Sequence, residues 1–273
     1  MGTRSILRPV LRPVTRAVSD TIRGFNPNSL FVSGEQGIWL DPSDFSTLFQ
    51  DSAGTTPVTA VGQPVGKILD KSRRGNHATQ STGASRPTLQ QDSNGMYYLS
   101  FDGTDDGMAT PSINFTGTDK MTVWAGFTNL GVGTSELYGL STNPTSNPAV
   151  MLRPTGGGGA SGNVGAYSRG SSTFVLAQAV GAGLPPVTLL TTAESSTSDP
   201  YLKLRVNGAL LEQNTLNQGA GNYGNYPLYI GARAGTSSYF NGRLYSLIVR
   251  GAASNAGQIA AGEAWVNGKT RAY

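Results

Sequence analysis

The feature that most constrains the fold is a repeated pattern of short period-two segments, each ended by a glycine-containing turn. The clearest segment is residues 201–206, which read Tyr-Leu-Lys-Leu-Arg-Val, so apolar side chains face one side and cationic side chains the other. Asn207-Gly208 follows and favours the two positive-φ positions of a tight hairpin turn. Leu210-Leu211 then begins a return strand. The pattern predicts antiparallel hairpins.

Similar strand signals recur at short intervals along the second half of the chain. We expect further strands at residues 97–101, 121–127, 137–140, 150–152, 164–168, 174–176, 226–231 and 239–249. The period changes only near the C-terminus, where Asn255 can cap a short helix that Gly268 closes. That helix carries Ile259, Glu263 and Val266. The sequence therefore predicts an all-β fold, an antiparallel two-sheet sandwich with a short C-terminal helix.

The chain divides into an arm and a body. Residues 1–30 are expected to form an extended basic arm, and residues 31–273 a single sandwich domain of a size that one core can support. Within the body, residues 31–95 are rich in Gly, Pro, Ser and Thr, so we expect a turn-rich segment that wraps over the main sandwich of residues 96–273.

The arm holds the whole net charge of the chain. Residues 1–30 carry five arginines and one acid, which gives +4, whereas residues 31–273 carry 15 basic and 15 acidic groups. A neutral body argues against a broad nucleic-acid-binding face. In the arm, Leu-Arg-Pro-Val repeats at residues 7–10 and 11–14, and its prolines favour an extended chain.

An extended apolar and cationic strip has no core of its own, so we expect it to order on another protein. The predicted docking residues are Arg4, Leu7, Arg8, Val10, Leu11, Arg12, Val14 and Arg16. A disordered tail is the alternative. A nucleic-acid-binding arm has weaker support, because neither lysines nor stacking aromatic residues accompany the arginines.

Composition excludes several classes of site. The chain has no cysteine and one histidine, which excludes disulfides, thiolate zinc sites, iron–sulfur clusters and multi-histidine metal sites. No apolar run approaches the ~20 residues of a membrane span, and arginines and prolines interrupt the position of a secretory signal. The glutamates are isolated and no acidic trio alternates along a strand, so we expect no enzyme. His77 is expected to be a structural loop residue.

Two further patterns have a structural and a functional interpretation each. Asp102, Asp105 and Asp106 cluster in a glycine-flanked turn; hard oxygen ligands can hold calcium, but aspartate is also an ordinary turn residue. No other cofactor is expected. Tyrosines and asparagines at 222–226 could stack on and hydrogen-bond to a sugar, or pack a loop. The candidate glycan-binding residues are Asn222, Tyr223, Asn225 and Tyr226. Tyr229 and the three tryptophans, Trp39, Trp124 and Trp265, are assigned to packing.

The order of elements resembles the concanavalin A-like, laminin-G-like jelly roll. The resemblance rests on Leu99-Ser100-Phe101-Asp102-Gly103, residues 202–208, Tyr229-Ile230-Gly231-Ala232, and Phe240-Asn241-Gly242-Arg243-Leu244 running into Leu247-Ile248-Val249. It implies a jelly-roll sandwich. In related lectin-like domains calcium is used.

A second, narrower resemblance concerns residues 37–44, 48–58 and 69–80, which look like the opening of a family of tailed-bacteriophage proteins that also begin with Arg-Pro-Val arms. One departure is Arg74, where similar domains often have a second glycine.

The resemblance implies a non-enzymatic structural component of a tailed-phage virion, associated with the tail and host adsorption. The arm would bind other phage structural proteins, and we expect a homo-oligomer in the particle. The alternatives are a carbohydrate-binding module for a host surface glycan, or a capsid decoration protein. No nucleic-acid or membrane partner is expected.

Overall fold

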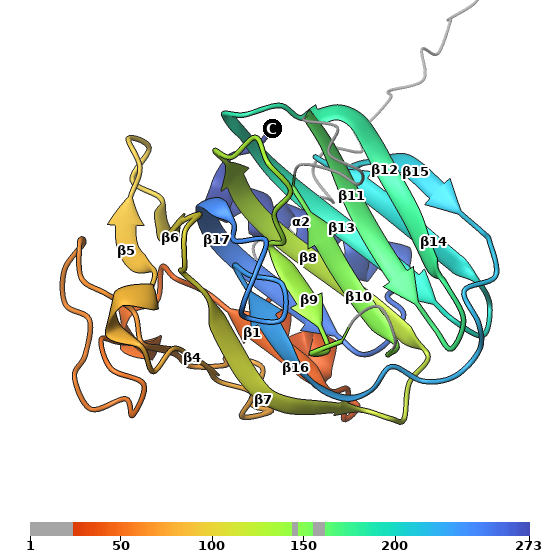
Figure 1. Ribbon diagram of the computed structural model, residues 1–273, viewed down its shortest axis with the longest axis horizontal. Coiled ribbons are helices and arrows are strands. Elements are labelled where there is room, and N and C mark those ends of the chain that lie inside the picture. Colours follow the sequence, from red (N-terminus) through yellow and green to blue (C-terminus); the bar gives the residue numbers. More distant parts are fainter. Residues whose placement is uncertain (1–23, 144–146, 155–161) are drawn as a thin grey trace, which may run out of the picture.

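The computed structural model describes residues 24–143, 147–154 and 162–273, and within them the strands form two antiparallel sheets packed face to face (Figure 1). The eight-stranded sheet has, in spatial order, β15 (Ala209–Asn214), β14 (Tyr201–Val206), β13 (Val187–Ser196), β8 (Lys120–Asn129), β17 (Asn241–Arg250), β6 (Tyr97–Asp102) and β5 (Thr88–Gln91), with β1 (Gly37–Leu40) paired to β17. The nine-stranded sheet has β12 (Phe174–Gly183), β11 (Gly162–Arg169), β10 (Ala149–Arg153), β9 (Tyr138–Leu140), β16 (Gly224–Ile230), β7 (Met108–Phe115), β4 (Ala78–Thr79), β3 (Lys67–Ile68) and β2 (Leu48–Phe49).

This arrangement confirms the predicted sandwich. The hairpin of β14 and β15 turns at Asn207 and Gly208, which have φ angles of 50° and 77°, as a tight two-residue turn requires. β17 lies between β8 and β6, and its segment from Leu244 to Arg250 is buried, as expected for a central strand. The sequence analysis predicted none of the strands β1 to β5 in the wrapping segment, and it also missed β7 and β13. β13 is an interior strand, paired with β14 on one side and β8 on the other, but the Thr- and Ser-rich composition of its second half hides the strand pattern.

The C-terminal helix α2 (Ala256–Thr270) begins where predicted. The side chain of Asn255 accepts a hydrogen bond from the backbone of Gln258, whose own side chain accepts one from the Asn255 backbone. The predicted end at Gly268 is wrong. The helix continues to Thr270, and Arg271 takes the left-handed conformation that ends it. No helix in the described part of the chain is long and apolar enough to span a membrane.

Helix α2 and the short 3₁₀ helix η1 (Pro27–Phe31) cover the outer face of the eight-stranded sheet. Their side chains bury a second apolar cluster, separate from the core between the sheets, made of Leu30, Phe31, Trp39, Trp124, Leu190, Ile248, Ile259 and Val266. Gly262 permits the close approach of the helix, because a Cβ there would lie 2.7 Å from Nε1 of Trp124. The packing roles predicted for Trp39 and Trp124 are thus confirmed, and Trp265 packs edge-on against Trp39.

The same cluster corrects the predicted boundary of the arm. Pro27 and Leu30 are buried in the body, although the sequence analysis placed them in the arm. The boundary was misplaced because residues 27–31 form a helical turn against the outer face of the sheet, a contact that no local pattern announces. The predicted docking residues, from Arg4 to Arg16, lie outside the described residues.

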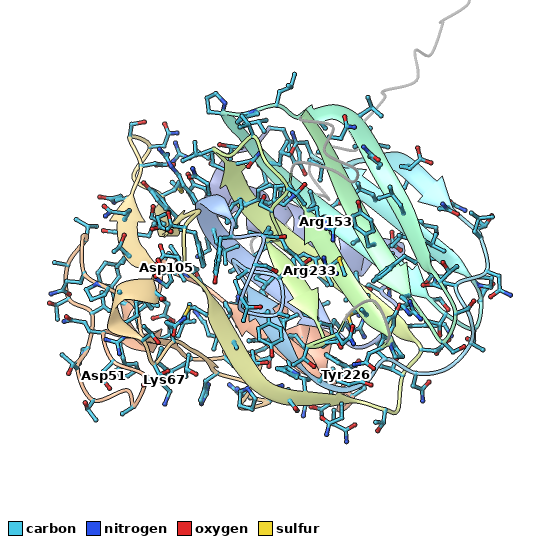
Figure 2. The ribbon with its side chains drawn as sticks, viewed as in Figure 1. Asp51, Lys67, Asp105, Arg153, Tyr226 and Arg233 are labelled. Atoms are coloured by element: carbon cyan, nitrogen blue, oxygen red, sulfur yellow. The ribbon has the colours of Figure 1, made fainter. Side chains whose placement is uncertain are left out.

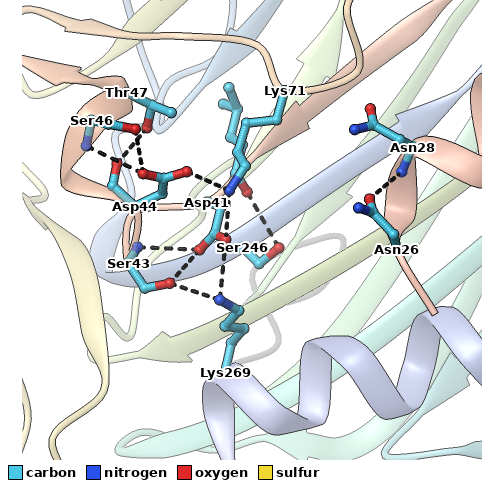
Figure 3. A network of polar contacts seen from close by, with 11 residues as sticks. Asn26, Asn28, Asp41, Ser43, Asp44, Ser46, Thr47, Lys71, Ser246 and Lys269 are labelled. Carbon is cyan, nitrogen blue, oxygen red and sulfur yellow. Dashed lines mark hydrogen bonds and ion pairs between the residues drawn. The ribbon is translucent and has the colours of Figure 1, made fainter. Parts of the chain in front are cut away.

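Ion pairs fasten α2 to the wrapping segment (Figure 3). Lys269 on α2 lies 3.1 Å from Asp41 and donates to Ser43. Lys71 lies 3.3 Å from Asp41 and 2.6 Å from Asp44. These two aspartates therefore neutralise lysines and hold the wrapping segment against the helix.

A buried turn at residues 70–77 organises the wrapping segment. The Asp70 carboxylate accepts backbone hydrogen bonds from Trp39, Ser72 and Asn76. His77 accepts a hydrogen bond from the Asp70 backbone at 2.9 Å, which confirms its structural role. The left-handed positions of the turn are Arg73 and Gly75, so a glycine is not required at Arg74.

Candidate functional site

The nine-stranded sheet presents the open face of the sandwich. Helix α2 lies behind the eight-stranded sheet, and no helix of the described residues covers the outer face of the nine-stranded sheet (Figure 1).

The four predicted glycan-binding residues do not form one platform. Tyr223 is fully buried, and its hydroxyl lies within hydrogen-bond distance of Ser168 and Ser195 between the sheets. The interpretation of Tyr223 as an exposed stacking ring is therefore wrong. Tyr223 follows a loop of Gly and Asn, which suggested exposure. Its large side chain instead fills one end of the core between the sheets.

The other three residues lie close to Tyr223 in the sequence, but each side chain has different surroundings. The Asn222 side chain donates to the backbone of Thr116, and Asn225 is exposed opposite Asn114 on β7. Tyr226 is half-buried against the core, with its ring folded over Gly224, whose Cβ position would lie 2.5 Å from the ring. These contacts favour loop packing over sugar binding.

The three aspartates of the 102–106 turn do come together. One carboxylate oxygen from each of Asp102, Asp105 and Asp106 lies within 4.8 Å of the others. Burial, with repulsion from the other two, raises the pKa of Asp106 to about 6. The Asp106 carboxylate also accepts from the Asp102 backbone, and Ser85 donates to Asp105. Carboxylate oxygens are the type of ligand that calcium prefers. The calcium site stays a prediction.

A better-formed hollow lies beside this turn on the open face. It has a volume of about 350 Å³. Pairing across the sheet places Tyr229 of β16 opposite Ala109 of β7, and Ala109 opposite Thr79 of β4. Because Ala109 is small, the space between the Tyr229 ring and the β4 edge stays open. The lining residues are Thr79, Gln80, Ser81, Gly107, Met108, Ala109, Tyr229, Ala234 and Gly235.

A strained loop forms one wall of the hollow. Between β16 and β17, Gly231, Ala234, Gly235 and Ser238 all have positive φ angles between 50° and 81°. For Ala234 and Ser238 this conformation costs on the order of 1 kcal/mol each, and such strain gathers at binding sites. A Cβ on Gly235 would lie 3.2 Å from the Tyr229 ring, so the loop packs directly on that ring and fixes it.

Glu136 fills the space on the other side of Tyr229. Tyr229 also pairs with Gly139 of β9, and the Glu136 carboxylate occupies the volume that a side chain at residue 139 would need. Glu136 is 1% exposed, and burial raises its pKa to about 7, although the positive charges of Arg153 and Arg233 act in the opposite direction. Figure 2 shows both arginines in front of the nine-stranded sheet.

Arg153 extends the polar strip away from the hollow. Its Nε lies 3.9 Å from Glu136 Oε2, and its guanidinium stacks over the Tyr167 ring at 4.8 Å. Among the described residues, neither of those two atoms, nor the Tyr167 hydroxyl, has a hydrogen-bond partner. The open face therefore combines two tyrosines, two arginines and a buried carboxyl group within neighbouring strands.

A larger hollow, of about 1040 Å³, lies between α2 and the β14–β15 turn. Three charged residues, Arg205, Glu263 and Arg271, line it. Arg205 and Glu263 bind each other at 2.6 Å, and Arg205 also donates to the Gly208 carbonyl. The ion pair of Arg205 and Glu263 is engaged in holding the helix to the sheet. We therefore place the candidate ligand site at Tyr229.

Sequence reasoning missed Tyr229 and its neighbours. Tyr229 lies in an apolar strand, and the pattern assigned it to packing. The signal that marks the hollow is the small size of Ala109 on the neighbouring strand β7, and this signal has meaning only once the register is known.

Comparisons with known proteins identify the fold. No protein-family model matches the sequence, and no curated protein matches it. Among solved structures, the chain is similar to the binding domain of botulinum neurotoxin DC in complex with SialylT, with a TM-score of 0.55 and 8% identity over 88% of this chain and 52% of that one. The binding domain of serotype D gives a TM-score of 0.56 with 10% identity, over 86% and 52% of the two chains.

A binding domain of serotype G gives a TM-score of 0.53 with 8% identity, over 73% of this chain and 48% of that one. This chain thus spans about half the length of the neurotoxin binding domains that it matches. At these identities the matches show the fold alone, and they confirm a jelly-roll-like sandwich of two antiparallel sheets.

Proposed function

We propose that this chain is a non-catalytic carbohydrate-binding module whose ligand occupies the Tyr229 hollow. The observation that supports it most is the pairing of Tyr229 with Ala109, which leaves one side of a half-buried aromatic ring facing an open, polar-lined space. The C–H face of a sugar ring packs on an aromatic ring, and nearby hydroxyl and amide groups then fix its orientation.

The lining chemistry suits a neutral sugar ring. Thr79 and Ser81 offer hydroxyl groups, and the amide of Gln80 is already oriented by a hydrogen bond of 2.6 Å to the Gly107 carbonyl. The volume of about 350 Å³ is at the lower end of the range for ligand pockets.

The shared fold adds support of a weaker kind. One neurotoxin binding domain of this fold is described in complex with SialylT. The same two-sheet framework therefore supports recognition in another protein, although fold alone does not fix function.

The direct test is a glycan array probed with the wild-type chain and two matched tyrosine variants, followed by titration calorimetry on the best ligand. Tyr229→Ala is expected to weaken binding at least tenfold, because stacking is lost. Tyr226→Ala, on the same strand but outside the hollow, is expected to bind as the wild type does. The proposal is wrong if the wild type binds no glycan, or if Tyr229→Ala binds as tightly as the wild type.

A second proposal concerns where the module is displayed. The resemblance of residues 37–44, 48–58 and 69–80 to tailed-bacteriophage proteins supports a structural component of a tailed-phage virion, tail-associated or on the capsid. The arginines and the repeated Leu-Arg-Pro-Val motif of the arm favour its binding to a neighbouring particle protein, with the sandwich facing outward. Purified particles carrying the full chain or a chain without residues 1–23 test it. Co-sedimentation of the full chain alone would support the arm as an anchor; equal co-sedimentation of both would contradict it.

A further inference from the structure

The loop of residues 231–238 connects β16 to β17 and supplies part of the wall of the Tyr229 hollow. Its base is anchored to the sheet, because Gly231 donates a backbone hydrogen bond to Leu137 and accepts one from Phe240. The loop begins after β16 ends and is complete before β17 begins. It can therefore open as a flap about this base without breaking the pairing of either strand.

A single backbone hydrogen bond among the described residues ties the far part of the loop to the sheet. The N–H of Glu136 donates to the carbonyl of Ser238 at 2.9 Å. The other backbone bonds of this part of the loop join Arg233 to Thr236 and Ser237, within the loop itself. Solvent exchange at the Glu136 amide therefore reports directly whether the loop is closed.

The closed loop holds both strain and unpaired polar atoms. Ala234 and Ser238 have φ angles of 50°, a conformation that side chains other than glycine rarely adopt and that gathers at switch regions. Ser135 Oγ, Glu136 Oε2 and Arg153 Nε are buried without a hydrogen-bond partner. A buried polar atom without a partner costs free energy that hydration would return. Strain and missing hydrogen bonds thus both favour opening.

We propose that the 231–238 loop is a lid on Glu136 and that the charge of this carboxyl group controls its opening. The Glu136 carboxyl group is 1% exposed and lies over the backbone of Gly139 on β9. Two cations face it, Arg153 from β10 at 3.9 Å and Arg233 from the loop itself. An ionised carboxylate here gains from both cations but loses its hydration.

The other titratable groups around this carboxyl group are phenols. Tyr229 lies on the adjacent strand β16, opposite Gly139, and Tyr167 of β11 lies under the Arg153 guanidinium. Tyrosine side chains ordinarily lose their proton near pH 10. Near neutral pH, Glu136 is therefore the group of this cluster whose charge changes.

The direction of the effect follows from linkage. Burial outweighs the two arginines, because the pKa of Glu136 is raised from 4.5 to about 7. When the loop opens, water reaches the carboxyl group and its pKa returns toward the ordinary value. Loss of the proton therefore favours the open loop, and the ratio of open to closed molecules rises with pH between about 4.5 and about 7. The lid is closed at acidic pH and opens more often near neutral pH.

Opening of the lid would change the hollow itself. Ala234 and Gly235 line the hollow, and a Cβ on Gly235 would lie 3.2 Å from the Tyr229 ring. An open lid removes this wall and frees the ring, so the affinity for a ligand in the hollow should fall as the pH rises. This consequence rests on the proposed function, whereas the lid does not.

Hydrogen exchange of the full chain, measured by NMR at the Glu136 amide and expressed as a protection factor, tests the lid. In the wild type the protection factor is expected to fall roughly tenfold or more between pH 5 and pH 7. In Glu136→Gln the protection factor at residue 136 should not depend on pH. Glu194→Gln is the matched control: Glu194 is half-buried on β13 of the other sheet, so this variant should behave as the wild type does.

The amide of Leu137 separates loop opening from unfolding of the sheet, since it donates to Leu152 on β10. The Glu136 amide should exchange faster than the Leu137 amide. Urea at about 1 M should speed exchange at Leu137 but not at Glu136, because a local opening exposes little surface.

Equal urea sensitivity at the two amides would overturn the proposal, because Glu136 would then exchange only when the sheet unfolds. A wild-type protection factor at Glu136 that is constant with pH would also overturn it, as would the same pH dependence in Glu136→Gln. None of these measurements uses a glycan. A chain that binds no sugar would therefore contradict the proposed function and leave the test of the lid intact.

Discussion

The Glu136 carboxylate lies in the volume that a side chain at Gly139 would occupy. The two residues thus share one site on the outer face of the nine-stranded sheet, directly beside Tyr229. The absence of a side chain at residue 139 lets a buried carboxyl group approach the backbone of β9, and this carboxyl group in turn limits the ligand hollow to the Ala109 side of Tyr229.

Gly139→Ala is therefore expected to destabilise the protein by about 2 kcal/mol or more, because a packed, buried side chain would have to move. Urea unfolding followed by fluorescence measures the change. Gly117→Ala is the matched control: its Cβ would meet nothing within 4 Å, so its stability should stay within about 0.5 kcal/mol of the wild type. Equal stability of both variants would contradict the close packing of Glu136.

Glu136 should also make stability depend on pH. Its pKa is raised from 4.5 to about 7 in the folded chain, so between these values the folded state binds more protons than the unfolded state. The free energy of unfolding must then fall as the pH rises from about 4.5 to about 7, by on the order of 3 kcal/mol from this group.

The comparison with Glu136→Gln isolates that contribution. The variant should gain stability relative to the wild type between pH 5 and pH 8, whereas Glu212→Gln, at an exposed position of β15, should not. A constant difference between Glu136→Gln and the wild type across this range would show that the carboxyl group does not titrate there.

Lys269 is expected to contribute to stability through Asp41, whose side chain is 4% exposed. Lys269→Met should cost about 1–2 kcal/mol, since one of the two lysines that compensate the buried carboxylate is lost. Lys120→Met is the control, because Lys120 is 40% exposed and lies 3.6 Å from Asp119; it should cost less than about 0.5 kcal/mol. Similar costs for the two variants in urea unfolding would argue against a clamp between α2 and the wrapping segment.

Calcium at Asp102, Asp105 and Asp106 is testable by thermal unfolding. At ten times its dissociation constant, a bound ion stabilises by about 1.4 kcal/mol, which raises the midpoint by about 3 °C. Asp105→Asn should abolish this rise, and Asp199→Asn, in an exposed turn, should retain it. A midpoint insensitive to millimolar calcium would leave the turn interpretation of these aspartates.

The sequence predicted the elements better than the site. Alternation at 201–206 and the Asn207-Gly208 turn identified a hairpin, and Asn255 identified the start of α2, because these signals are local. β13 escaped detection, since its second half is polar although it is buried between β8 and β14. Tyr223 was misassigned for the complementary reason: a polar, glycine-rich context surrounds a side chain that the core requires.

What the sequence by itself determined is therefore the fold class and the separation of a basic arm from a neutral body, because alternation, turn residues and charge are properties of neighbouring positions. The tertiary structure alone decided which strands lie side by side. That choice places Tyr229 opposite Ala109 and Gly139 and buries Glu136 beside two arginines. Each of these features depends on the register of residues far apart in the chain, so no local pattern carries it.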